Sequence, residues 1–129
     1  MNKDTHERRL FERIFFSSED GIIGIFSLPD PYKDTARATI MDISEDGMGI
    51  TFLKKECPPF NKGERLVLKE IVNMDSISFL KDIELEIRWV LSHRSLEHIA
   101  LGCRLVNLSE QAKEKLRKVI GSWSIKIRV

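Results

Sequence analysis

Residues 83–91 read IELEIRWVL, and this stretch decides the fold class of the chain. Its apolar residues stand at every second position, while charged residues occupy positions 84, 86 and 88; the apolar set is Ile83, Leu85, Ile87, Trp89 and Leu91. Successive side chains of a β-strand point to opposite faces, so this alternation predicts a strand with one face in a hydrophobic core.

The neighbouring sequence extends this strand into a sheet. Residues 99–105 repeat the alternation after the link SHRSLEH, which predicts an antiparallel hairpin. Asp46-Gly47 predicts a second hairpin, with the positive backbone dihedrals of a tight turn. Further strands are expected near residues 21–27, 37–43, 47–53 and 64–72. Six short strands with one helix predict a mainly β fold, a six-stranded antiparallel β-barrel with a C-terminal α-helix.

The expected helix spans residues 109–120. Ser109 can cap its first amide groups, and Gly121 can supply the left-handed turn that ends it. Beyond it, residues 122–129 alternate again (WSIKIRV from Trp123), which is compatible with an additional strand.

Composition indicates one soluble domain over residues 1–129. The chain is 42% hydrophobic and 32% charged, which is too apolar for a disordered protein. It has no apolar run long enough for a membrane helix, and its N-terminus MNKDTHERR lacks the apolar core of a signal peptide. We therefore expect a cytoplasmic protein without membrane insertion. The 21 basic and 20 acidic residues nearly cancel, so binding to DNA or RNA is not expected.

Motifs for catalysis or metal binding are missing from the sequence. His6, His93 and His98 stand in no metal-ligand pattern, and there is no P-loop, G-x-S-x-G or G-x-G-x-x-G. Cys57 and Cys103 are interpreted as reduced thiols, although a disulfide between them stays open. The scattered phenylalanines are better explained as core filling than as a platform for stacking bases. These features predict no enzyme, no metal site and no cofactor.

Two short motifs remain as candidate binding elements. The first is Arg-x-x-x-Arg at Arg9 and Arg13, which is common by chance and could equally belong to a short amphipathic helix. The second is Asp-x-Ser-x-x-Gly at Asp42, Ser44 and Gly47, which is rare by chance but could be only a hydrogen-bonded turn. Each motif alone indicates little, but their occurrence together and in this order indicates a binding site.

With these two motifs, the chain resembles the PilZ domain family, whose members bind the bacterial second messenger cyclic di-GMP. Residues 87–90 (IRWV) and 101–109 (LGCRLVNLS) resemble the later strands of the family, and the resemblance implies its six-stranded barrel and terminal helix. Two segments depart from the pattern. Residues 73–82 look longer than a simple hairpin loop, and residues 122–129 extend past the helix.

The motif residues suit this ligand chemically. A guanidinium can donate two hydrogen bonds to guanine O6 and N7, can pair with a phosphate and can stack on a purine. Asp42 and Ser44 are two residues apart on a strand end, so both should face the ligand, Asp42 accepting from guanine N–H groups and Ser44 donating to phosphate. Gly47 allows close backbone approach.

We expect the arm of residues 1–16 to be flexible without ligand. Arg8 adds a third guanidinium, and in this family the residue at that place is expected to influence stoichiometry, which predicts two ligands per chain.

The sequence therefore predicts a cyclic di-GMP receptor domain that passes the signal to an unidentified downstream protein. One alternative is a PilZ-like adaptor that acts by protein contacts without binding nucleotide. A second alternative, from another class, is a small hydrolase that uses Asp42, Ser44 and a histidine as base.

Overall fold

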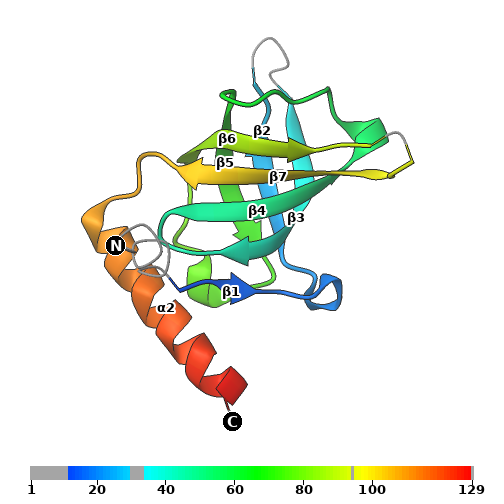
Figure 1. The fold of residues 1–129 in the computed structure, drawn as a ribbon. Coiled ribbons are helices and arrows are strands. Elements are labelled where there is room, and N and C mark those ends of the chain that lie inside the picture. The colour runs from blue at the N-terminus through cyan, green and yellow to red at the C-terminus, as the bar shows by residue number, and fades with distance from the viewer. Residues whose placement is uncertain (1–11, 30–33, 94, 129) are drawn as a thin grey trace, which may run out of the picture.

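The computed structural model describes residues 12–29, 34–93 and 95–128, which form a barrel of strands with one long helix beside it (Figure 1). The strands are β1 (Ile14–Phe15), β2 (Ile23–Ser27), β3 (Thr35–Ile43), β4 (Gly47–Leu53), β5 (Arg65–Val72), β6 (Ile83–Leu91) and β7 (His98–Leu105). Short 3₁₀ helices span Ser18–Asp20 (η1), Lys54–Glu56 (η2) and Asp75–Ile77 (η3), and α2 covers Glu110–Arg128.

Six strands close the barrel. The sheet order is β1-β3-β2-β5-β6-β7-β4, and an additional pairing of β3 with β4 joins the two sides of the ring. Every pairing is antiparallel, and β1 adds a short seventh strand outside the ring by pairing with β3. The predicted six-stranded antiparallel barrel with a C-terminal helix is therefore confirmed. The predicted hairpin of residues 83–91 and 99–105 is the β6–β7 pair.

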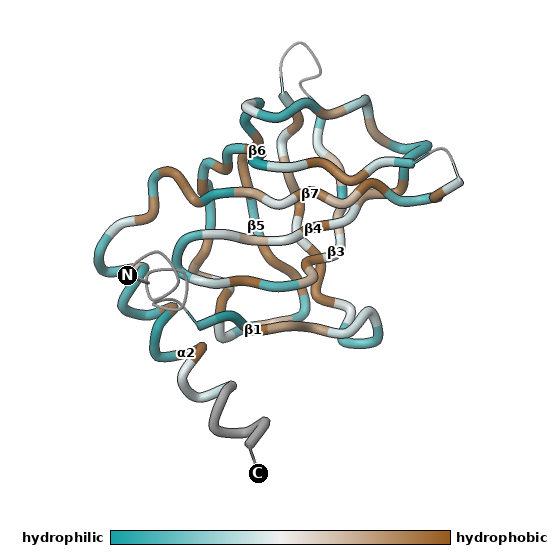
Figure 2. The backbone as a smooth tube through the Cα atoms, viewed as in Figure 1, coloured by the Kyte–Doolittle hydropathy of each residue, from teal (hydrophilic) through white to brown (hydrophobic). Residues whose placement is uncertain are grey.

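The alternating apolar residues fill the interior of the barrel. Ile83, Leu85 and Ile87 of β6 are buried as predicted, and the rings of Phe26 and Phe52 meet edge to face at 5.8 Å between centroids. Figure 2 shows hydrophobic residues recurring along the strands, while hydrophilic residues dominate the first turns of α2. In a closed barrel, interior-facing side chains alternate with exterior ones along every strand, and this alternating set fills the interior.

The prediction for the second half of β6 is wrong. Trp89 and Leu91 were expected in the core, but they are 52% and 56% exposed. The pairing with β7 runs from Ile87 opposite Cys103 to Trp89 opposite Gly102, so one extra residue, Arg88, is inserted in β6. This β-bulge reverses the alternation, because each side chain after it points to the opposite face.

Residues 73–82 close one end of the barrel. Asn73 and Asp82 flank this segment with positive φ angles of 73° and 54°. Between them, Ile77 and Leu80 are buried in the core. The segment that looked too long for a loop therefore carries a hydrophobic plug, and α2 contacts its 3₁₀ helix.

The C-terminal helix is longer than predicted. Ser109 accepts a hydrogen bond at its Oγ from the amide of Ala112 (3.1 Å), which confirms the predicted N-cap. The helix does not end at residue 120, and residues 122–128 continue it instead of forming a strand. Gly121 lies inside the helix because a residue just beyond it is packed: the Trp123 ring meets Phe16 edge to face, with 5.7 Å between ring centroids.

The N-terminal arm is anchored over its last residues. Residues 1–11 lie outside the described residues, but Ile14 and Phe16 are buried in the core and β1 pairs with β3. The expected flexibility of residues 1–16 stays a prediction, but two of the last three residues of this arm, Ile14 and Phe16, have their side chains in the core, whereas Phe15 is exposed. Within the described ranges, no helix has the length and apolar character needed to cross a membrane.

Candidate functional site

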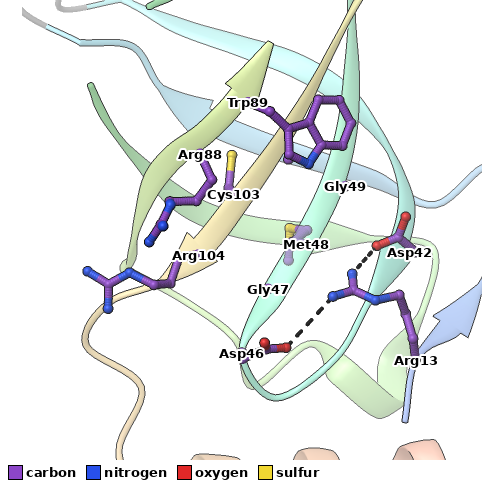
Figure 3. Close-up of a pocket in the computed structure, with 11 residues that line it drawn as sticks. Arg13, Asp42, Asp46, Gly47, Met48, Gly49, Arg88, Trp89, Cys103 and Arg104 are labelled. Carbon is purple, nitrogen blue, oxygen red and sulfur yellow. Dashed lines mark hydrogen bonds and ion pairs between the residues drawn. The ribbon is translucent and has the colours of Figure 1, made fainter. Parts of the chain in front are cut away.

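A cleft of about 530 Å³ lies on the outer surface of the barrel, across strands β3, β4, β7 and β6 (Figure 3). One side carries Arg13, Asp42 and Asp46, while the other carries Arg88 and Arg104. The floor is formed largely by backbone of β4 and β7; the remaining lining residues are Gly47, Met48, Gly49, Trp89, Gly102 and Cys103. The cleft therefore combines charged walls with a floor in which three glycines, Gly47, Gly49 and Gly102, leave the backbone uncovered.

Arg13 joins the two sequence motifs. Its guanidinium donates a hydrogen bond to Asp42 Oδ1, and its Nη2 lies 3.7 Å from Asp46 Oδ1 (Figure 3). Arg13 reaches this position because Ile14 and Phe15, the next residues, pair with Ile43 and Asp42. The strand pairing of β1 thus fixes the second arginine of one motif against the aspartate of the other.

A second bulge aims Asp42 at the cleft. In the pairing of β3 with β4, Ile40 lies opposite Ile50 and Asp42 opposite Gly49, so Met41 is an inserted residue. A Cβ atom at Gly49 would lie 2.6 Å from Asp42 Oδ2, so the carboxylate leans directly over that glycine. The side chain of Asp42 is 21% exposed, which leaves its oxygens accessible from the cleft.

Ser44 lies inside the turn and does not line the cleft. It is fully buried, and its hydroxyl donates to Asp46 Oδ1 while its amide donates to the Gly47 carbonyl (2.9 Å). Asp42 and Ser44 were expected to face the same way, and the structure differs because the strand ends at residue 43 and Ser44 begins the turn. Ser44 therefore holds the shape of the hairpin that presents Asp46.

Gly47 is needed for close approach and not for an unusual dihedral. It does not have the expected positive φ; among the described residues, the glycines that do are Gly21 and Gly63. A Cβ atom at Gly47 would lie 2.8 Å from the Cys103 carbonyl oxygen and 3.5 Å from Arg13 Nη2. The missing side chain lets β4 pack against β7 beside the cleft.

The opposite wall was not predicted from the sequence. Arg104 donates to Glu86 Oε1 from Nε (3.2 Å) and Nη2 (3.0 Å), and Arg88 Nη1 lies 3.9 Å from the same oxygen. The hydrogen bond from Arg104 lowers the pKa of Glu86, with further lowering by the charges of Arg104 and Arg88. Trp89 was assigned to the core by its position in the alternation, and only the bulge places it at the cleft.

Helix α2 contacts the hairpin motif and a residue close to Arg13. Arg117 Nε donates to Glu45 Oε2 at 2.8 Å, and Glu45 stands in the turn between Ser44 and Gly47. Phe16, three residues after Arg13, packs on Trp123. The segments that hold Arg13 and Asp46 are thus both tied to one helix.

The described histidines do not supply a base for Ser44. His93 shares a hydrogen bond with Ser95 Oγ (2.6 Å), and His98 pairs with Leu53 at the far end of β4 from Gly47. Within the same described ranges, no cluster of three or more His, Cys, Asp or Glu side chains could hold a metal ion. The geometry around Ser44 is that of a turn, with Asp46 as its partner.

The structure brings together Arg13, Asp42 and Gly47 of the predicted site at one cleft, with Ser44 beneath the adjoining turn. Arg8 and Arg9 lie outside the described residues. Fold and site together define a small antiparallel barrel with a surface cleft in which charged side chains surround exposed backbone.

The PilZ domain family model matches residues 7–122, and the chain belongs to this family. Among solved structures, the PilZ domain of YcgR from Escherichia coli with c-di-GMP has a TM-score of 0.63 at 21% identity, covering 94% of this chain and 95% of that one. Bacillus subtilis MotI (DgrA), an inhibitor of motility, has a TM-score of 0.66 at 15% identity, covering 95% of this chain and 54% of that one.

The MrkH–c-di-GMP complex of K. pneumonia has a TM-score of 0.58 at 15% identity, and the match covers 94% of this chain and 54% of MrkH. The chain therefore spans about half the length of MotI and MrkH, and nearly all of the YcgR PilZ domain. A direct comparison with curated proteins gave no match. At these identities the likeness establishes the shared fold.

Proposed function

We propose that this chain is a receptor domain for cyclic di-GMP and has no catalytic activity. The observation that carries the proposal is the meeting of the two motifs: Arg13 lies between Asp42 and Asp46 at the rim of the cleft. The family and the cyclic di-GMP complexes of YcgR and MrkH support the choice of ligand.

The chemistry of the cleft suits the two guanines and two phosphodiesters of this ligand. Arg13 offers a planar donor to guanine O6 and N7 or to phosphate, and Asp42 can accept from the guanine N–H groups. Arg13 is held by carboxylates in the free protein, so a ligand that binds it must share or replace these contacts. Ser44 and Gly47 act by keeping the hairpin closed on β7.

Arg8 and Arg9 complete the proposed site, and both are assigned from the sequence alone. Arg9 is the first arginine of the motif, and Arg8 is a third guanidinium that could neutralise a second ligand. We propose two cyclic di-GMP molecules per chain, falling to one in Arg8→Ala. Titration at protein concentrations well above the dissociation constant measures this ratio, and a ratio of one in both proteins would contradict it.

The test of function is a calorimetric titration of the full chain with cyclic di-GMP. GMP, cyclic di-AMP and a DNA duplex serve as control ligands, and we expect binding of cyclic di-GMP alone. Arg13→Ala should lose most of the affinity, and Arg13→Lys should also bind weakly because lysine lacks the planar fork. The matched control is Arg37→Ala on β3, away from the cleft, which should bind like the wild type.

Retained affinity in Arg13→Ala would contradict the site. No binding of cyclic di-GMP by the wild type would favour the second candidate, a PilZ-like adaptor that acts by protein contacts. In either case we propose a cytoplasmic protein that passes its signal to a downstream protein. Because α2 contacts Glu45 of the hairpin motif and Phe16, three residues after Arg13, we propose this helix as the element through which binding would be sensed.

A further inference from the structure

The positive charge of the chain is concentrated in the second half of α2 and the residue after it. Residues 115–129 contain five basic residues and no acidic one; the basic residues are Lys115, Arg117, Lys118, Lys126 and Arg128. Residues 1–114 hold the other 16 basic residues and all 20 acidic ones, which gives that part a formal charge of −4. The near-neutral chain is therefore an acidic body with a strongly basic helix end.

One stripe of α2 is packed on the rest of the protein. Leu116 and Ile120 are buried, and the Trp123 ring meets Phe16 edge to face. These three helix positions follow one another at intervals of four and three residues, so they lie along one face of the helix. This face belongs to the core.

A second stripe carries lysines. Lys115, Lys118, Ser122 and Lys126 follow one another at intervals of three or four residues, about a third of a turn around the axis from the buried stripe. Position 125 lies two turns after Lys118 and belongs to the same stripe, which places an aliphatic residue, Ile125, among the cations. Lys115, Lys118 and Ser122 are exposed. We call these five residues the cationic stripe.

Carboxylates do not compensate the described lysines of this stripe. Arg117, which lies beside the stripe, donates to Glu45 Oε2 at 2.8 Å. Lys115 instead has its Nζ over the ring of Phe79, 5.6 Å from the centroid. Lys118 forms no ion pair with any residue that the structure describes. The charge of the stripe is therefore available to an external anion.

The helix presents this charge beyond the barrel. Helix α2 contacts β1, which is only two residues long, and η3. Figure 1 shows the last turns of α2 extending past the strands toward the C-terminus. A broad surface can therefore approach the end of the helix without meeting the barrel first.

Charge and pattern favour an anionic lipid surface as the occupant. A second copy of the chain would bring five like charges against five, which opposes self-association through this stripe. A helix with lysines and arginines beside aliphatic residues lies in the headgroup region of a bilayer and does not cross it. Anionic headgroups attract the lysines, and they repel the acidic body of the chain, so the helix end is turned toward the surface.

We propose that the cationic stripe docks on an anionic lipid surface. Lys115, Lys118 and Lys126 pair with headgroup phosphates, and Ile125 adds an aliphatic contact at the same depth. The inference does not depend on cyclic di-GMP, so it stands or falls separately from the proposed function.

Co-sedimentation of the full chain with lipid vesicles tests the inference in the absence of cyclic di-GMP. The probe is a vesicle of phosphatidylglycerol and phosphatidylethanolamine in equal parts, and a phosphatidylcholine vesicle is the neutral control. We expect binding to the anionic vesicle alone. Added salt should release the protein, because it screens the attraction between lysines and headgroups.

Paired charge variants locate the contact. The double variant Lys118→Gln, Lys126→Gln should bind the anionic vesicle about 10- to 30-fold more weakly, since each lysine near such a surface contributes about 5-fold. The matched control is Lys55→Gln with Lys62→Gln. It makes the same change in net charge between β4 and β5, where both lysines are exposed, and should bind like the wild type.

Single substitutions test the stripe in both directions. Ser122→Lys adds a cation to the stripe and should bind about 5-fold more tightly, whereas Ser92→Lys, exposed after β6, should not change binding. Ile125→Ser should bind about 5- to 10-fold more weakly because it removes the aliphatic contact. Melting temperatures and far-ultraviolet circular dichroism check that each variant keeps its fold and its helix.

Each contrary outcome identifies what is wrong. No binding of the anionic vesicle by the wild type overturns the inference and leaves the receptor proposal intact, because that proposal is measured by titration with cyclic di-GMP. Equal losses in the two lysine pairs overturn the cationic stripe, because binding then follows net charge. Polyglutamate or a DNA duplex that competes as well as the vesicle would assign the stripe to an acidic macromolecule and overturn the lipid surface.

Discussion

Asp42 and Ser44 stand two residues apart in one motif but have different surroundings. Asp42 is partly exposed in the cleft and contacts Arg13, whereas Ser44 is fully buried under the turn and contacts Asp46. A side chain that meets the ligand and one that shapes the hairpin should respond differently to the same truncation.

We therefore expect Asp42→Ala to weaken cyclic di-GMP binding by about 1–3 kcal/mol, as the loss of a base-edge contact does. Ser44→Ala should weaken binding less but lower the free energy of unfolding by about 1–2 kcal/mol, because it removes a buried hydrogen bond. Calorimetric titration and urea unfolding measure the two quantities. The reverse ranking in affinity would show that the roles are exchanged.

Gly47 allows a similar test of backbone contact. Gly47→Ala should destabilise the protein by about 1–3 kcal/mol, because the new methyl group overlaps the Cys103 carbonyl oxygen and neither group is flexible. The control is Gly63→Ser. A side chain at Gly63 meets open space, so any loss of stability in this variant comes from the positive φ of 93° and not from overlap with other atoms. A Gly47→Ala protein as stable as the wild type would mean that β4 moves freely from β7.

Among the secondary-structure elements, α2 shows how packing determines where a helix ends. Gly121 lies inside it, and apart from its chain neighbours and the backbone of the helix itself, no atom lies within 4 Å of the position a Cβ would take. Glycine in a helix interior costs about 1 kcal/mol relative to alanine. The helix continues because Trp123, two residues later, reaches Phe16.

Gly121→Ala should therefore raise the free energy of unfolding by about 0.5–1 kcal/mol and increase the helical signal in far-ultraviolet circular dichroism. The substitution has space and meets no strained dihedral. Destabilisation by alanine at this position would instead support the predicted end of the helix at Gly121.

The strands were largely predictable, because alternation reports one buried face directly. The two bulges were not. Met41 and Arg88 each insert one residue into a strand, and nothing in the local pattern around Arg88 distinguishes Trp89 from the core residues before it. Bulge positions depend on the partner strand, which a single stretch of sequence does not contain.

The terminal helix was mispredicted for a related reason. The spacing of Leu116, Ile120 and Trp123 fits a helix, while residues 123–129 also alternate. Only contact with Phe16, more than 100 residues earlier, decides between the two. For the site, the motifs contain Arg13, Asp42 and Gly47, which the structure places at one cleft, but β6 and β7 contribute lining residues that belong to no motif.

In the molecule as a whole, the buried thiol of Cys103 makes the free energy of unfolding depend on pH. Burial raises the pKa of the Cys103 thiol to about 12, against about 8.5 for an exposed thiol. A raised pKa means that the folded state favours the protonated thiol. This contribution to stability is complete below about pH 8.5 and is lost as the pH rises toward 12.

We expect the stability difference between the wild type and Cys103→Ala to narrow between about pH 9 and pH 12. At pH 8, iodoacetamide should label the half-buried Cys57 before Cys103 in the folded protein. Urea unfolding across the pH range and mass spectrometry of labelled peptides measure these effects. A constant stability difference, or labelling of Cys103 first, would contradict the assigned burial.

Asp42, Gly49, Gly102 and Trp89 are paired in succession across strands β3, β4, β7 and β6, and this alignment has a consequence for folding kinetics. These four residues come from both halves of the chain and become neighbours only when β4 pairs with both β3 and β7 and when β6 pairs with β7. Contacts between distant parts of a chain form late and slowly. A ligand of the cleft, which spans the same four strands, finds no complete site until these strands have paired, so its presence should slow unfolding while leaving the rate of refolding almost unchanged.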